Sequence, residues 1–218
     1  MKYEAIIFDC DGVLIDSEVV VNRALAEALT ALGLPTTLDQ AIADFTGRST
    51  EETDRMIATR LGRPLPDAFR AMVRDAVTGN PDAITAVAGA TDFMGALRPG
   101  PRAVASSSSL NWIASHLERL GLARHFDGHL YSGREHVTRT KPAPDIYLHA
   151  ASAIGANPAQ TLVIEDSPTG VQAAIAAGMT VVGLCAGGHC RPGLGDRLRD
   201  AGAHHVVANY SEVSALLR

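Results

Sequence analysis

The sequence predicts an α/β protein, a doubly wound parallel sheet with an inserted helical segment. Two observations predict this class. Short apolar runs alternate with helical patterns from about residue 92 onward, which is typical of parallel strands joined by helices. Between a first apolar run at Ala5–Phe8 and that region, the chain shows helical patterns and no convincing strand. We therefore expect a core domain of residues 1–15 and 83–218 and a helical cap domain of residues 16–82.

The helical segment should contain four helices, because apolar residues recur in it at helical spacing and glycine or proline separates the runs. Thr37 with Gln40, and Ser49 with Glu52, have the spacing of capping boxes. In a capping box the two side chains satisfy backbone N–H groups at the start of a helix. The expected helices cover residues 16–32, 37–45, 49–60 and 67–77.

The second part of the chain should supply the rest of the sheet. Its apolar runs are short enough for strands, and glycines close the helical patterns between them. The expected strands cover residues 102–106, 129–131, 161–164, 180–184 and 204–208. The expected helices cover residues 92–97, 111–120, 144–154 and 170–177.

Composition excludes several classes of protein. No apolar run approaches the ~18 residues of a membrane span, and the first residues lack a signal-peptide pattern. A formal charge of −5 without a basic run argues against a nucleic-acid partner. Cys185 and Cys190 flank His189, but this spacing fits no usual zinc pattern. We expect a cytoplasmic, soluble protein without membrane or nucleic-acid partners, either a monomer or a weak homodimer.

The choice of basic residues singles out one lysine. Of 19 basic residues 17 are arginine, and Lys141 is the one lysine beyond the start of the chain. A lysine ammonium is a compact point charge, whereas the guanidinium of arginine is a wide planar fork. Lys141 is therefore a candidate for a role that needs a compact cation, although a solvated loop charge is the alternative.

Polar residues follow the predicted strands at the points where the strands end. Each group has a structural alternative: a turn, a helix start or a polar loop. Together they suit phosphoryl transfer, because clustered carboxylates need a divalent cation, and hard oxygen ligands favour Mg²⁺. A hydroxyl and backbone N–H groups after the second strand can hold phosphate oxygens. The residues in question are Asp9 and Asp11, Ser106 and Ser107, Glu165 and Asp166, and Lys141.

These residues resemble the four motifs of the haloacid dehalogenase-like superfamily. The resemblance rests on Asp9-Cys10-Asp11-Gly12-Val13-Leu14, Ser106, Lys141 and Glu165-Asp166, and it extends over essentially the whole chain. Within the superfamily the chain is similar to the phosphatase and β-phosphoglucomutase-like branch, whose members carry a helical cap. The set of motifs is specific, whereas each motif alone would be weak.

The resemblance implies a role for each core residue. Asp9 would be the nucleophile that forms an aspartyl-phosphate, and Asp11 the acid/base for the leaving oxygen and then for water. Ser106 and Lys141 would hold the phosphate. The implied Mg²⁺ ligands are Asp9, the backbone carbonyl of Asp11, and Asp166, with Glu165 either a further ligand or a neighbour of the ligands.

Substrate selection is expected in the cap. Glu18 follows the first motif, and a loop between two cap helices is where caps of this type place specificity residues. The expected contacts are Glu18, Gly47, Arg48 and Ser49, beside Ser107 of the core.

The expected function is a Mg²⁺-dependent phosphatase acting on a small phosphorylated metabolite, a sugar phosphate or a sugar-acid phosphate. A β-phosphoglucomutase-like isomerase is one alternative, and a non-catalytic module that binds phosphate esters is another. In the mutases a histidine on the first cap helix assists catalysis, and an arginine in the cap loop grips a distal phosphate. The matching positions here are Val21 and Thr50, although Arg48 could replace that arginine.

Overall fold

The computed structural model describes residues 3–48 and 50–218, and it divides into two compact units. The larger unit runs to Asp16 and resumes at Ala86, and the smaller unit is Ser17–Thr85. The range expected for the helical segment was 16–82. The two units are connected by chain crossings near residues 16 and 86, so the smaller one is an insertion into the larger.

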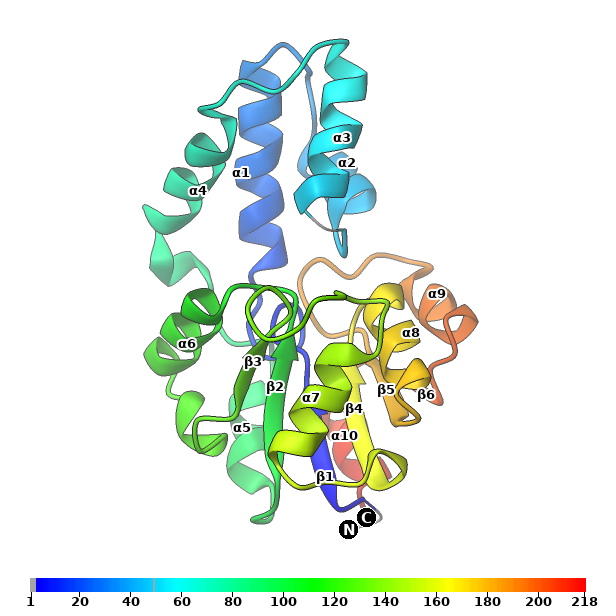
Figure 1. Cartoon of the computed structure of the whole chain (residues 1–218). Coiled ribbons are helices and arrows are strands. Elements are labelled where there is room, and N and C mark those ends of the chain that lie inside the picture. Colours follow the sequence, from blue (N-terminus) through cyan, green and yellow to red (C-terminus); the bar gives the residue numbers. More distant parts are fainter. Residues whose placement is uncertain (1–2, 49) are drawn as a thin grey trace. The chain divides into compact units, whose positions relative to one another are not determined.

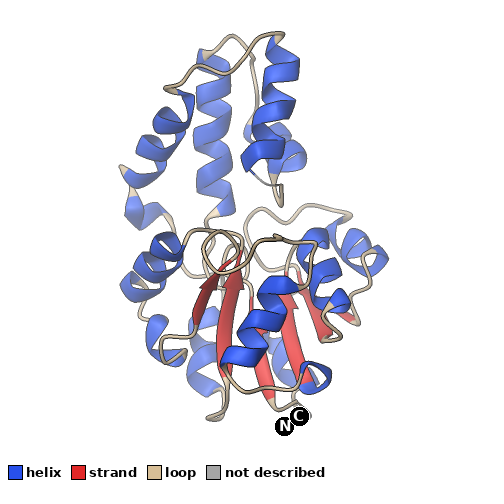
Figure 2. Cartoon of the chain, viewed as in Figure 1, coloured by secondary structure: helices blue, strands red, loops and turns tan. Residues whose placement is uncertain are grey.

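Six parallel strands form the sheet of the larger unit, in the order β3-β2-β1-β4-β5-β6 (Figures 1 and 2). The chain runs from β1 to β2 and β3 on one side, then crosses to β4, β5 and β6 on the other. The predicted doubly wound parallel sheet is thus confirmed, with its reversal beside β1. Ligands of such sheets bind at the carboxyl ends of the strands near the reversal. The strands are β1 (Ala5–Phe8), β2 (Arg102–Ser106), β3 (Leu130–Ser132), β4 (Thr161–Glu165), β5 (Thr180–Leu184) and β6 (His205–Val207).

The register of the central strands aligns their ends. Phe8 of β1 pairs with Val104 of β2 and with Ile164 of β4. Parallel strands share one direction, so the residues that follow these positions gather at one edge of the sheet. Asp9 directly follows Phe8, and Glu165 directly follows Ile164. The pairing of Phe8 with Ile164 therefore brings both carboxylates to that edge.

Both faces of the sheet are covered, which explains why its strands are apolar runs without alternation. Ile7 packs with side chains of α7, α8 and α9 in one buried cluster. Phe8 faces the other side, with ring centroids 6.3 Å from Phe93 and 5.8 Å from Phe126. Phe93 in turn packs against Tyr210 at 4.8 Å. The helices of this unit are α5 (Ala90–Ala96), α6 (Leu110–Arg119), α7 (Asp145–Ala153), α8 (Pro168–Ala176), α9 (Leu194–Asp200) and α10 (Tyr210–Leu216), with short 3₁₀ turns at Ala123–His125 and Pro158–Gln160.

Among its described residues, the smaller unit contains helices joined by loops and no strand. The capping box predicted at Thr37 and Gln40 is confirmed: the Gln40 N–H donates to Thr37 Oγ1 at 3.2 Å, and the Thr37 N–H donates to Gln40 Oε1 at 2.8 Å. The second predicted capping box includes Ser49, which lies outside the described residues. The helices are α1 (Glu18–Ala31), α2 (Leu38–Phe45), α3 (Thr50–Leu61) and α4 (Phe69–Thr78), followed by a 3₁₀ turn at Pro81–Ala83.

Two helices near the end of the chain were not predicted. For α10 a signal was present, because Asn209 accepts from the Glu212 N–H at 3.0 Å as an N-cap three residues before a glutamate. For α9 it was absent: the helix starts after Gly193, whose φ is +87° and which offers no capping side chain. Within residues 3–48 and 50–218, no helix is long and apolar enough to cross a membrane.

Candidate active site

The nucleophile candidate Asp9 lies directly after β1 and is held by Lys141. The Lys141 ammonium donates to Asp9 Oδ1 at 2.6 Å, to Glu165 Oε1 at 2.8 Å and to the backbone carbonyl of Ala105 at 3.0 Å. Its nitrogen also lies 4.7 Å from the ring centroid of Tyr147 on α7, whose hydroxyl donates to Glu165 Oε1 at 3.0 Å. An ammonium has three N–H groups, and here each has a protein acceptor. A loop lysine is thereby tied to the ends of β1, β2 and β4.

Glu165 is engaged at both carboxylate oxygens. Oε1 receives Lys141 and Tyr147, while Oε2 accepts from the backbone N–H groups of Asp166 and Ser167 at 2.8 Å each. The helix α8 approaches closely here, since a Cβ on Gly170 would lie 1.5 Å from Glu165 Oε1. Of the two roles that the sequence left open for Glu165, this geometry favours the positioning of Lys141 over metal ligation.

The acid/base candidate Asp11 is oriented by residues at the start of α6. Ser108 Oγ donates to Asp11 Oδ2 at 2.6 Å, and Trp112 Nε1 donates to Asp11 Oδ1 at 2.9 Å. Ser106 Oγ lies 3.4 Å from Asp11 Oδ2 and accepts from the Ser108 N–H at 3.0 Å. Ser106 therefore sits beside Asp11 at the end of β2, as its place in the sequence predicts. Ser107 is exposed, and its backbone carbonyl accepts from Arg134 Nε at 3.0 Å.

Asp166 lies after β4 and contacts a histidine from the loop after β5. His189 Nε2 is 3.0 Å from Asp166 Oδ2, and both side chains are buried. Gly12 makes this approach possible: its φ is +78°, and a Cβ there would lie 1.8 Å from Asp166 Oδ2. A Cβ on Gly187 would likewise lie 2.7 Å from His189 Nδ1. The glycine of the first motif is thus required both by its backbone conformation and by the space that Asp166 occupies.

Burial and mutual repulsion dominate the electrostatics of this cluster. Burial raises the pKa of Asp9 well above its ordinary value; Lys141 opposes this, and the carboxylates of Glu165, Asp166 and Asp11 add to it. Burial works against the charge of Lys141, but Asp9 and Glu165 raise the pKa of its ammonium well above the ordinary value. Lys141 is therefore positively charged at neutral pH, and the carboxylates around it carry more negative charge than it neutralises.

The same balance holds around His189. Burial alone would lower the pKa of its imidazole, but the hydrogen bond to Asp166 and the nearby Cys190 raise it to about 11. Burial raises the pKa of Asp166, and His189 opposes that shift. Asp166 and His189 thus form a buried hydrogen-bonded pair in which the carboxylate favours the protonated imidazole.

The residues fit a hard divalent cation in chemistry. In the described residues, no three His, Cys, Asp or Glu side chains are grouped as a ready-made metal site. Asp9 and Asp166 nevertheless offer carboxylate oxygens at adjacent strand ends, and burial raises the pKa of each, so a cation beside them would favour their charged forms. Hard oxygen donors with surplus negative charge select Mg²⁺ over softer metals.

A model of the haloacid dehalogenase-like hydrolases matches residues 3–178. The chain belongs to this family. The resemblance predicted from the four motifs is therefore confirmed, and so is the expected enzyme class, a phosphoric monoester hydrolase.

Known members of the family are similar to this hydrolase over most of its length. The 6-phosphogluconate phosphatase of Escherichia coli (strain K12) is 30% identical, over 88% of this chain and 86% of the relative. The fructose-1-phosphate phosphatase YqaB of the same organism is 32% identical, over 83% of this chain and 96% of the relative. A crystal structure of a HAD family hydrolase from Deinococcus radiodurans R1, with bound phosphate and sodium, has a TM-score of 0.83 and 32% identity and covers 99% of this chain and 95% of that one.

Two of the substrate contacts expected in the helical unit, Glu18 and Arg48, interact with other residues of that unit. Glu18 accepts from Asn22 Nδ2 at 3.0 Å on α1. Gly47 has a φ of +77° in the loop after α2. Arg48 donates to the backbone carbonyl of Asp44 at 2.6 Å and forms an ion pair with Glu52. Ser49, the last of the four expected contacts, lies outside the described residues.

Four residues that contact the candidate catalytic and metal-binding side chains were not predicted from the sequence: Ser108, Trp112, Tyr147 and His189. Ser108 belongs to a run of four serines in which the sequence favoured Ser106 and Ser107. Trp112 and Tyr147 read as ordinary helical residues. For His189 a signal was available, because two glycines precede it and such glycines often mark a close approach of the backbone. The cysteines on either side of it suggest only a zinc pattern, which their spacing does not fit.

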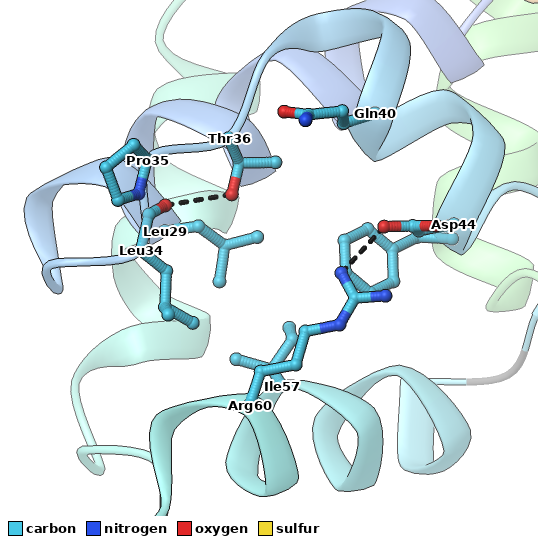
Figure 3. Close-up of a pocket in the computed structure, with 9 residues that line it drawn as sticks. Leu29, Leu34, Pro35, Thr36, Gln40, Asp44, Ile57 and Arg60 are labelled. Atoms are coloured by element: carbon cyan, nitrogen blue, oxygen red, sulfur yellow. Dashed lines mark hydrogen bonds and ion pairs between the residues drawn. The ribbon is translucent and has the colours of Figure 1, made fainter.

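A pocket of about 190 Å³ lies within the helical unit (Figure 3). Arg60 reaches Asp44 at 2.6 Å and lies 5.4 Å from the ring centroid of Phe45. The expected substrate contacts are not part of its lining, which consists of Leu29, Leu34, Pro35, Thr36, Gln40, Asp44, Phe45, Ile57 and Arg60.

Proposed function

We propose that this hydrolase is a Mg²⁺-dependent phosphatase that cleaves a small phosphorylated metabolite, a sugar phosphate or sugar-acid phosphate, through an aspartyl-phosphate on Asp9. The observation that carries the proposal is the buried Lys141, which links Asp9 to Glu165 at the carboxyl ends of β1 and β4. The substrate class is supported by relatives that are named for 6-phosphogluconate and fructose 1-phosphate.

The proposed reaction has two steps. An Asp9 oxygen attacks phosphorus, the ester P–O bond breaks, and the leaving oxygen takes a proton from Asp11. Water then gives a proton to Asp11 and attacks the aspartyl-phosphate, which releases inorganic phosphate and restores Asp9. Ser106 and the Lys141 ammonium bind the phosphoryl oxygens. To do so, one N–H of Lys141 exchanges its present protein acceptor for a phosphoryl oxygen.

Mg²⁺ would be held by Asp9, the backbone carbonyl of Asp11, and Asp166, where it would neutralise charge on the phosphoryl oxygens. His189 orients Asp166 through its hydrogen bond, and Glu165 positions Lys141. We assign the choice of substrate to Glu18, Gly47, Arg48 and Ser49 of the helical unit, which acts as the cap, together with Ser107 of the core.

A screen of phosphorylated metabolites with Mg²⁺ present tests the proposal through phosphate release. We expect turnover of sugar phosphates or sugar-acid phosphates that exceeds turnover of nucleotides and phosphoamino acids. Saturable binding of phosphate esters without phosphate release at any Mg²⁺ concentration would instead identify a non-catalytic module.

Metal removal gives a second expected result. EDTA should silence the enzyme and Mg²⁺ should restore it, while Asp166→Asn should raise the Mg²⁺ concentration for half-maximal rate by at least about tenfold. Asparagine keeps a hydrogen-bond acceptor for His189, so the higher Mg²⁺ requirement would report on the lost negative charge of the ligand. Asp92→Asn, an exposed change on α5, is the control. Full activity in EDTA would mean that no essential metal is present.

A third experiment separates phosphatase from mutase. A mutase must return its phosphoryl group to a sugar hydroxyl, and the positions of the mutase histidine and arginine are here Val21 and Thr50. Arg48, the possible substitute, is engaged with Asp44 and Glu52 of its own unit. We expect phosphate release from monophosphates and no conversion of β-glucose 1-phosphate to glucose 6-phosphate, even with a bisphosphate primer. Primer-dependent isomerisation with little free phosphate would overturn the phosphatase assignment.

A further inference from the structure

The single tryptophan of the chain makes a polar contact at the active site. Trp112 Nε1 donates to Asp11 Oδ1 at 2.9 Å, across a sequence separation of 101 residues. Ser108 Oγ donates to the other oxygen of the same carboxylate at 2.6 Å. One oxygen of Asp11 thus receives a donor from the loop before α6, and the other receives a donor from the first turn of α6.

The local structure fixes the direction of the indole. Ser109 caps α6, with its Oγ accepting from the Trp112 N–H at 3.3 Å, so Trp112 lies in the first turn of the helix. One turn later the ring of His116 packs against the indole, with centroids 4.0 Å apart and planes at 43°. His116 Nδ1 also lies 2.9 Å from the backbone carbonyl of Trp112. The half-buried indole therefore packs against His116, and its N–H donates to Asp11.

We propose that Trp112, together with Ser108, is a positioning residue that sets the orientation of the Asp11 carboxylate for proton transfer to the leaving group. This inference rests on the proposed function, in which Asp11 is the acid/base. An acid must lie within hydrogen-bond reach of the oxygen that it protonates, and small errors in its placement are costly. An indole N–H and a hydroxyl on opposite oxygens define the plane of the carboxylate, which neither donor alone can do.

A packing role and a positioning role predict different substrate dependence. An alkoxide leaving group, as in a sugar phosphate, needs a proton as its P–O bond breaks. The leaving group of p-nitrophenyl phosphate is a stable anion and needs almost none. Because kcat/KM reports steps up to formation of the aspartyl-phosphate, it isolates the acid role of Asp11 from its later role with water.

The decisive variant is Trp112→Phe, which keeps an aromatic ring and removes the N–H. We expect kcat/KM for the best sugar phosphate of the parent to fall at least about tenfold. For p-nitrophenyl phosphate it should stay within about twofold of the parent. Asn111→Ala, an exposed change on the same helix, should alter neither value. An equal loss on both substrates would indicate packing alone and would overturn the positioning role.

Ser108 provides a second variant that does not depend on replacing a large side chain. Ser108→Ala should show the same selective loss, and Ser108→Thr, which restores a hydroxyl, should recover most of the rate. The losses in the double variant Ser108→Ala/Trp112→Phe should be less than additive, because both donors act on one carboxylate. Fully additive losses would contradict a shared action on Asp11.

Fluorescence tests the contact without any turnover. Because Trp112 is the one tryptophan, emission from the metal-free enzyme reports on its surroundings alone. Asp11→Ala removes the acceptor and should shift the emission maximum, whereas Asp92→Ala should not. An unchanged spectrum in Asp11→Ala would overturn the contact even if the phosphatase is active. Absence of phosphate release by the parent with every ester would instead overturn the proposed function, and the positioning role of Trp112 with it.

Discussion

Asp9→Asn should lower turnover by at least about 10³-fold while leaving the fold intact. An amide oxygen is too weak a nucleophile to attack phosphorus, so the covalent route is lost. Asparagine has the shape of aspartate and still offers Oδ1 to the Lys141 ammonium, which donates to that atom at 2.6 Å. It also removes one charge from a cluster in which burial raises the pKa of Asp9. The unfolding temperature of the metal-free protein is therefore not expected to fall.

Steady-state rates with the best ester of the parent, together with thermal unfolding, check this result. Asp196→Asn, an exposed carboxylate on α9 that pairs with Arg199, is the matched control and should keep the parental rate. Acid quench of the parent during turnover, followed by mass spectrometry, should find one phosphoryl group on the peptide that contains Asp9. Near-normal activity in Asp9→Asn would reject the covalent mechanism.

The four inner strands β2, β1, β4 and β5 could be predicted because they are almost wholly buried and so appear as short apolar runs. The N-cap side chain of Thr37 also marked a helix start, because a cap is an interaction between residues that are close in the sequence. The helix α9 could not be predicted on that basis, because it begins after Gly193 without a side-chain cap and contains only seven residues. Its position is decided by packing of Leu194 and Leu198 against the sheet.

The residues at the strand ends could be predicted for a different reason. Parallel pairing carries all carboxyl ends to one edge, so polar residues after β1, β2 and β4 must converge. Which of them touch could not be predicted. Lys141 reaches Asp9 over 132 residues, and Trp112 reaches Asp11 over 101, so these contacts depend on how a loop and a helix are placed against the sheet. That Glu165 contacts Lys141 while Asp166 contacts His189 could not be predicted from the sequence either.

Lys141→Arg should be nearly as inactive as Lys141→Ala, with a loss of at least about 10²-fold. The ammonium donates from one nitrogen to three acceptors, Asp9, Glu165 and the carbonyl of Ala105, at 2.6 to 3.0 Å. A guanidinium spreads its donors over a plane and cannot direct three of them from one point. The lysine side chain is only 5% exposed, so a larger head group has no space to move into solvent. Arginine would therefore displace Asp9 from its place after β1.

The control for this exchange is Arg139→Lys, two residues earlier on the same loop, where the guanidinium is 70% exposed and should tolerate replacement. Stability must be separated from catalysis, because truncating one partner of a buried ion pair costs roughly 3–5 kcal/mol. Lys141→Met should therefore lower the unfolding temperature, and Glu165→Gln in the same chain should restore part of it by removing an unpaired buried charge. Activity should not return with stability, since Asp9 still lacks its cation. Recovery of most of the parental rate in Lys141→Arg would show that positive charge alone is sufficient at this position. The compact shape of the lysine head group would then not be required.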